Sequence, residues 1–161
     1  MELNNIKSHF TATGIVFNQE GQFLFHFHPK IGYWLPPGGH VEENEEPQNA
    51  VLREITEETG LQCECLCYQP ELALNLINDD AVELVKPLAI LKEPINDKKQ
   101  GFHYHIDMIY LCRPLQHSKL TNNSFQWLTL TELKTKKTFE NVIRLIELTE
   151  KLLKLNVIKL S

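Results

Sequence analysis

Residues 38–61 read GGHVEENEEPQNAVLREITEETGL and concentrate acidic side chains beyond what folding alone requires. Positions 42–58 of this stretch hold seven glutamates and one arginine. Glu54, Glu57 and Glu58 have the spacing i, i+3 and i+4, which places them on one face of a helix. Like charges at this spacing repel one another and weaken an isolated helix. The pattern therefore predicts a face that binds a cation.

A proline and a glycine indicate where this helix begins and ends. Pro47 suits a first helical turn, and Gly60 suits the position after the last turn, where φ is usually positive. We therefore expect a helix over residues 47–59. Its buried side is predicted by four residues at helical spacing: Val51, Leu52, Ile55 and Thr59. Carboxylate oxygens held on the other side favour magnesium, manganese or calcium over zinc.

The spacing within this stretch resembles the Nudix box. Gly39 is followed after five residues by Glu45, and after seven more by the run REITEETGL at residues 53–61. The match fills every specified position of the box and covers 23 of the 161 residues. The resemblance implies a hydrolase that depends on Mg²⁺ or Mn²⁺ and cleaves a pyrophosphate linkage, commonly in a nucleoside diphosphate joined to another group.

The resemblance also implies roles for individual residues. Glu54, Glu57 and Glu58 are expected to be catalytic and to bind the metal, together with the backbone carbonyl of Gly38. The general base is expected to be either Glu54 or a glutamate on a later loop, for which Glu140 is the candidate. The number of metal ions is left open.

Four further residues are expected to support the metal ligands. Arg53 belongs to the catalytic group, but we expect it to orient the carboxylates together with Glu45, eight positions earlier, rather than to react. Gly39 is expected to bring the backbone close to the site, and Gly60 to end the helix.

Composition predicts a single domain over residues 1–161, long enough to bury a core. The formal net charge of −5 argues against an extended nucleic-acid-binding surface but is compatible with a small phosphorylated ligand. The N-terminal residues do not resemble a signal peptide, and no apolar run approaches the roughly 18 residues of a membrane span. We therefore predict a cytoplasmic protein with no membrane partner. The oligomeric state is left open, a homodimer included.

The remaining chain predicts a mixed sheet with two helices. Residues 10–17 and 22–27 are expected to form a hairpin, and the prolines and glycines of KIGYWLPPGG predict an irregular connector at 30–39. Further expected elements are strands at 61–69, 82–91, 102–112 and 125–130, a loop at 96–101, a helical turn capped by Thr131, and a last helix over 139–155. The resemblance implies a more specific arrangement within the α/β fold class. This is an α/β/α sandwich with the box helix on one side of a mixed β-sheet and the C-terminal helix on the other.

Several residues outside the box are candidates for lining a substrate site. His26 and His28 share one face of an expected strand, and Lys30 could reach a phosphate. His103 and His105 share another strand face with Asp107. Two histidines and a carboxylate could bind a transition metal, but strand side chains at i and i+4 lie roughly 13 Å apart, which disfavours that interpretation.

Three alternative functions share parts of this pattern. A binding or regulatory protein with the same fold would typically lack box carboxylates, whereas this chain keeps them. An isomerase acting on a diphosphate would keep the fold and the metal. A purely structural calcium site is disfavoured because its ligands usually come from a loop. The sequence leaves the substrate open among ADP-ribose, dinucleoside polyphosphates, nucleotide sugars and oxidised nucleoside triphosphates.

Overall fold

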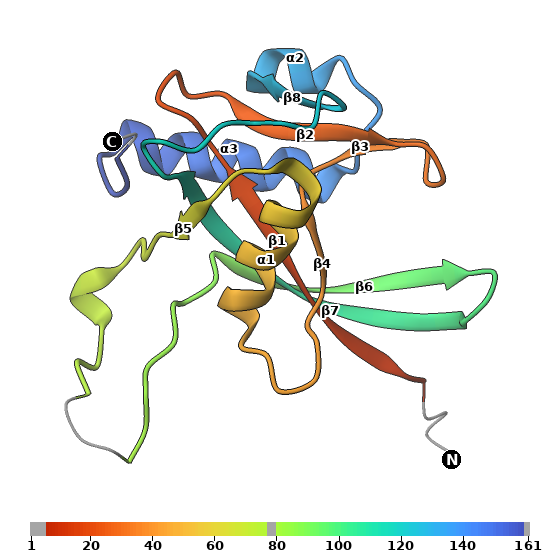
Figure 1. Cartoon of the computed structure of the whole chain (residues 1–161), viewed down its shortest axis with the longest axis horizontal. Helices are drawn as coiled ribbons and strands as arrows, with labels where there is room; N and C mark the ends of the chain where they lie inside the picture. Colours follow the sequence, from red (N-terminus) through yellow and green to blue (C-terminus); the bar gives the residue numbers. More distant parts are fainter. Residues whose placement is uncertain (1–5, 77–79, 160–161) are drawn as a thin grey trace.

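Two sheets and two long helices make up the computed structural model, which describes residues 6–76 and 80–159 (Figure 1). The larger, five-stranded sheet has the order β4 (Gly38–His40), β1 (Ser8–Val16), β7 (Gly101–Pro114) and β5 (Cys63–Cys65), with β6 (Ala89–Asp97) also paired to β7. The smaller sheet has the order β3 (Tyr33–Leu35), β2 (Phe23–His28) and β8 (Phe125–Leu128). The helices are α1 (Pro47–Thr59), α2 (Leu130–Lys134) and α3 (Glu140–Lys154), with a 3₁₀ turn at Pro70–Leu72.

Strand β1 lies inside the larger sheet, with a partner on each edge. It runs parallel to β7 in register from Ser8 opposite Tyr104 to Val16 opposite Cys112, and antiparallel to β4. The predicted hairpin of residues 10–17 with 22–27 is therefore wrong, because β2 belongs to the smaller sheet and only an isolated bridge from Phe17 joins the two segments. Strand β2 instead pairs along its two edges with β3 and β8.

Helix α1 covers one face of the larger sheet, and its bounds confirm the helix predicted over residues 47–59. Gly60 follows it in the left-handed conformation, with φ of 81°. A side chain at Gly14 would lie 2.8 Å from Ile55, so a glycine is needed where α1 crosses β1. The buried residues on this side form one cluster: Ala12, Val16, Leu24, Ala50, Val51, Ile55, Leu61, Tyr110, Cys112 and Phe125.

Helix α3 covers the opposite face of the larger sheet and also packs against the smaller sheet. Val142, Leu145 and Ile146 of this helix share a core with Ile15 and Ile109 of the larger sheet. The predicted α/β/α arrangement is thus confirmed, as is the last helix. Within the described residues, none of the helices is both long and apolar enough to cross a membrane.

The segment predicted as an irregular connector contains two short strands, so that prediction is wrong in part. Residues 33–35 form β3 in the smaller sheet and residues 38–40 form β4 in the larger sheet. Pro36 and Pro37 separate the two strands and carry the chain from one sheet to the other. Three-residue strands are too short for an alternation pattern to reveal them.

Three other boundaries differ from the predicted ones. Strand β6 begins at Ala89 instead of residue 82 and continues beyond residue 91 to Asp97, so it includes the first two residues of the predicted loop at 96–101. It tolerates Pro94 because it is an edge strand. Strand β5 covers only residues 63–65 of the predicted 61–69. The helical cap is Thr129, not Thr131, because Thr129 and Glu132 form a reciprocal capping box.

Replacing Ile55 by alanine tests the packing of α1 on the sheet. Ile55 is completely buried, so Ile55→Ala should lower the free energy of unfolding by about 2–5 kcal/mol. The matched control is Ile90→Ala on β6, where the side chain is 62% exposed and little change is expected. Urea denaturation followed by circular dichroism gives both values, and equal losses in the two variants would contradict this description of the core.

Candidate active site

Arg53 on α1 organises the box glutamates. Its Nε donates to Glu45 Oε1 at 2.8 Å and its Nη2 to Glu45 Oε2 at 3.0 Å, a two-point contact. Nη1 donates to Glu54 at 2.9 Å and to Glu57 at 3.2 Å, and Nη2 also reaches the His40 carbonyl at 3.1 Å. One guanidinium thus ties the first turn after β4 to the carboxylates of α1. The hydrogen bonds raise the pKa of Arg53 and lower that of Glu45.

Glycines let β4 lie directly against β1 and against Glu54. A side chain on Gly38 would come within 2.6 Å of the Ala12 carbonyl oxygen, and one on Gly39 within contact distance of the Glu54 carboxylate. The Gly38 amide donates to Glu58 Oε2 at 3.2 Å. Both expected glycines therefore bring backbone to the box carboxylates: a side chain at Gly38 would collide with the backbone of β1, and one at Gly39 would displace the Glu54 carboxylate.

Burial of Glu58 beside other carboxylates disfavours its charged form. Desolvation, followed by repulsion from Glu54 and Glu57, raises the pKa of Glu58 to about 7, although the Gly38 amide opposes the shift. Arg53 supplies a single positive charge to Glu45, Glu54 and Glu57. This all-oxygen set therefore has more negative charge than its arginine balances, and the residues fit a hard divalent cation.

The box carboxylates nevertheless do not converge on a single point. Arg53 Nη1 contacts Glu54 and Glu57, whereas Glu58 turns toward the Gly38 amide. Nη1 contacts one oxygen of each, Oε1 of Glu54 and Oε2 of Glu57, so each of these carboxylates keeps a second oxygen for a metal while Arg53 holds the first.

Beyond the part that α3 covers, the same face of the larger sheet carries polar side chains. Thr11 and Thr13 on β1 donate to the two oxygens of Asp107 on β7, at 2.9 and 2.8 Å. Burial raises the pKa of Asp107 although both hydroxyls oppose it. On the neighbouring strand, Glu93 accepts from Asn141 of α3 at 3.2 Å, and burial raises the pKa of Glu93 to about 7, aided by repulsion from Asp107.

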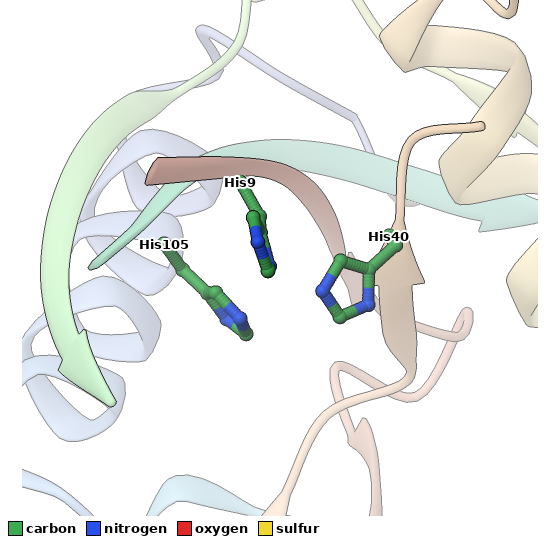
Figure 2. Close-up of side chains that lie close together, drawn as sticks. All are labelled: His9, His40 and His105. Atoms are coloured by element: carbon green, nitrogen blue, oxygen red, sulfur yellow. The ribbon is translucent and has the colours of Figure 1, made fainter. Parts of the chain in front are cut away.

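Four histidines lie at the outer end of the same face. His9, His40 and His105 come from β1, β4 and β7 and point toward one another (Figure 2). One ring nitrogen from each lies within 4.8 Å of the other two. Among the described residues, no other group of three possible metal-binding side chains has its ligand atoms this close together. His103 packs against His9 with ring centroids 4.6 Å apart.

Burial, followed by repulsion from neighbouring rings, lowers the pKa of two of these histidines, His105 and His9. Desolvation lowers the pKa of His105 to about 4, with further contributions from His40, His103 and His9. The pKa of His9 is lowered in the same way.

The cluster borders a hollow of about 630 Å³ whose lining residues are His9, Phe10, His40, Val41, Glu42, Glu45 and Gln100.

The other expected substrate residues lie elsewhere. His26 stacks on Phe125 at 4.4 Å and His28 accepts from the Ile31 amide, both in the smaller sheet. Lys30 is exposed in the turn after β2. Glu140 is in the first turn of α3 and pairs with Arg144 at 3.0 Å. The pair His26 and His28 and the pair His103 and His105 thus occupy different sheets.

Sequence reasoning missed His9, His40, Thr11 and Thr13. The segment SHFTATGIV places His9, Thr11 and Thr13 at i, i+2 and i+4, which is the signal of one polar strand face. His40 follows the two box glycines directly. Their convergence with His105 depends on the parallel pairing of β1 with β7, which no local pattern indicates.

The fold and site define a mixed-sheet α/β/α sandwich with a carboxylate helix beside a glycine strand, and comparison with known proteins identifies its family. The NUDIX domain family model matches residues 7–148. The crystal structure of a NUDIX-family hydrolase from Clostridium perfringens superposes with a TM-score of 0.71 and 26% identity, covering 93% of this chain and 99% of that one. The chain belongs to the Nudix family.

Curated relatives carry several different activities in their names. A probable DHNTP pyrophosphohydrolase from Lactococcus lactis subsp. cremoris is 30% identical over 123 residues, which is 76% of this chain and 64% of the relative. An 8-oxo-dGTP diphosphatase from Proteus vulgaris is 50% identical over 38 residues, 22% of this chain and 34% of the relative. The chain thus spans less than two thirds of the length of each of these relatives.

Removal of the Arg53 guanidinium should destabilise the box. Arg53→Ala leaves Glu45, whose side chain is 16% exposed, without its two-point partner and increases repulsion among the α1 glutamates. We expect a loss of about 2 kcal/mol in the free energy of unfolding. The control is Arg144→Ala, because Arg144 and Glu140 form an ion pair with both side chains 75% exposed, and such pairs contribute less than about 1 kcal/mol. Similar losses in both variants would contradict a special role for the Arg53 contacts.

The raised pKa of Glu58 predicts a pH dependence of stability. Between pH 4.5, the ordinary pKa, and about 7, the folded protein binds more protons at Glu58 than the unfolded chain does, so stability falls as pH rises through this window. Glu58→Gln should make that fall shallower. Thermal melts of metal-free protein across the window measure it, and superimposable pH profiles of the two proteins would disprove the assignment to Glu58.

Proposed function

We propose that this protein is a Mg²⁺- or Mn²⁺-dependent hydrolase that cleaves the pyrophosphate linkage of a nucleoside diphosphate joined to another group. The observation that carries the proposal is the under-neutralised carboxylate group of α1, held by Arg53 against the glycine backbone of β4. Family membership adds support, since relatives are named pyrophosphohydrolases or diphosphatases. The complete set of box carboxylates favours an enzyme over a binding protein of the same fold.

The residues that would hold the metal are Glu54, Glu57 and Glu58, with the Gly38 carbonyl as a further ligand. A divalent cation, when bound, neutralises charge on the phosphate oxygens and makes water a better nucleophile at neutral pH. The chain's own contribution is to hold its carboxylates in one place despite their repulsion. Arg53 does so by fixing Glu54 and Glu57 from α1 and Glu45 from the preceding loop. Gly39 has no side chain between the backbone and Glu54.

Glu54 is the better candidate for the general base. Its side chain is 18% exposed and lies against β4, beside the other metal-binding carboxylates. Glu140 is on α3 with its side chain 75% exposed and paired with Arg144. A base must lie within hydrogen-bonding reach of the attacking water, and Glu54 already neighbours the proposed metal ligands, so it needs the smaller rearrangement.

The proposed substrate is a small nucleoside diphosphate derivative, and the polar face of the larger sheet is the proposed place for its organic part. This face offers acceptors at Glu93 and Asp107, and α3 supplies Asn141. The names of relatives include a probable DHNTP pyrophosphohydrolase, an 8-oxo-dGTP diphosphatase and an RNA pyrophosphohydrolase, so they do not select one substrate.

Glu57→Gln should abolish most metal-dependent turnover while leaving the fold intact. The Glu57 side chain is 60% exposed and belongs to a repulsive cluster, so removing its charge costs little stability. We expect the rate to fall about 100-fold or more. The control is Glu20→Gln, which changes an exposed glutamate in the turn after β1.

The assay is a panel of nucleoside diphosphate derivatives and nucleoside triphosphates with Mg²⁺ or Mn²⁺, with products identified by mass. Metal-dependent release of a nucleoside monophosphate, phosphate or pyrophosphate by the unmodified protein is the expected result. Full activity of the Glu57→Gln protein would rule out the metal assignment, and binding of nucleotides without turnover of any of them would favour a non-catalytic protein.

A further inference from the structure

The histidines at the outer end of the larger sheet form a second site, distinct from the box in place and in chemistry. His9 and His105 are direct partners in the parallel pairing of β1 with β7, and His40 lies on β4 opposite Thr11. The three rings therefore share one face of three adjacent strands, which is how they meet although they are far apart in sequence (Figure 2). We propose that His9, His40 and His105 bind a transition-metal ion of the Zn²⁺ class.

The ligand set selects this class of metal. Imidazole nitrogens suit Zn²⁺, Co²⁺, Ni²⁺ and Cu²⁺, whereas Mg²⁺ and Ca²⁺ prefer oxygen ligands. A tetrahedral zinc ion with Zn–N bonds of about 2.0–2.1 Å holds its nitrogens roughly 3.4 Å apart. The three ring nitrogens here lie within 4.8 Å of one another, so rotation of the side chains closes the site without moving the strands. His40, which is exposed at the end of β4, has the freedom to make that adjustment.

His103 acts as the residue that positions His105. The Gly101 carbonyl can only accept a hydrogen bond, so His103 Nδ1 donates to it at 3.0 Å, and His103 Nε2 is then an acceptor. His105 Nε2 donates to that nitrogen at 3.2 Å, which leaves the lone pair of His105 at Nδ1. A metal-binding histidine typically uses its other ring N–H in this way, to fix its orientation and tautomer.

The surroundings favour a cation with an exchangeable fourth ligand. The hollow beside the histidines also has Glu42 and Glu45 in its lining, so it carries carboxylates and is open to water. Three protein ligands and an open position are the arrangement of accessible zinc sites rather than closed structural ones. The His40 carbonyl accepts from Arg53, so an ion held by the His40 ring also restrains the strand that leads into the box.

Cobalt and zinc titrations of tag-free, metal-stripped protein in saturating Mg²⁺ test this site, because Mg²⁺ occupies oxygen ligands and leaves histidines available. We expect one equivalent of Co²⁺ to give the visible absorption of a four-coordinate ion, one equivalent of Zn²⁺ to abolish it, and Zn²⁺ to raise the melting temperature. His9→Gln and His105→Gln should weaken binding at least about 10-fold, and so should His103→Gln if it positions His105. His40→Gln, at an exposed position, provides a ligand variant that is expected to fold.

Two controls separate this site from the box and from unspecific binding. His117→Gln removes an exposed histidine outside the cluster and should leave the titration unchanged. Glu57→Gln should also bind Zn²⁺ normally, even if it loses turnover, so failure of the proposed hydrolase activity does not affect this test. Absence of the cobalt spectrum, or binding that is lost in Glu57→Gln but kept in folded His9→Gln and His40→Gln, would overturn the proposal.

Discussion

The parallel pairing of β1 with β7 is the constraint on which the rest of the structure depends. Nine consecutive residue pairs, from Ser8 with Tyr104 to Val16 with Cys112, join the start of the described chain to its second half. This register decides which side chains face α1 and which face α3, since a shift by one residue would exchange the two faces. It places Thr11 beside Asp107 and His9 beside His105. The polar face around Asp107 and the histidine cluster therefore both depend on pairing between residues almost a hundred positions apart.

The glycines of β4 connect strand β1 to the carboxylates of the box. Gly38 pairs with Thr13 at a separation that a side chain would prevent, so β4 lies tightly on the edge of β1, and Gly39, opposite Ala12, leaves room for the Glu54 carboxylate. Helix α1 crosses the same strand over Gly14. The box carboxylates are thereby held between a strand edge and a packed helix, and Arg53 opposes the repulsion that this arrangement creates. Stability lost to like charges in one helix is offset by burial on its other side.

Local patterns predicted those parts of the molecule that local chemistry determines. The bounds of α1 followed from Pro47 and Gly60, and α3 followed from apolar residues at helical spacing. The contact of Arg53 with Glu45 was anticipated from their opposite charges, although Glu45 lies in the loop before α1 and not two helical turns away along the helix. Pairing of strands was not anticipated, because alternation shows that a strand has two faces but does not identify its neighbours. The hairpin of residues 10–17 with 22–27 was wrong for that reason, and the convergence of His9 and His40 on His105 was missed for the same reason.

His40 links two regions whose ligands prefer different cations. Its carbonyl contacts Arg53 and hence the oxygen-rich box, whereas its ring faces the nitrogen-rich cluster. Hard ions such as Mg²⁺ prefer oxygen ligands, whereas borderline ions such as Zn²⁺ also bind imidazole nitrogen, so ions at the two proposed sites need not compete. This holds although Gly38 of one site and His40 of the other are only two residues apart in sequence. If ions bind at both proposed sites and one of them orders β4, the free energy of binding at the other changes, and this coupling is equal in both directions. The short strand β4 is where such coupling would act, because it contributes backbone to the box region and the His40 side chain to the cluster.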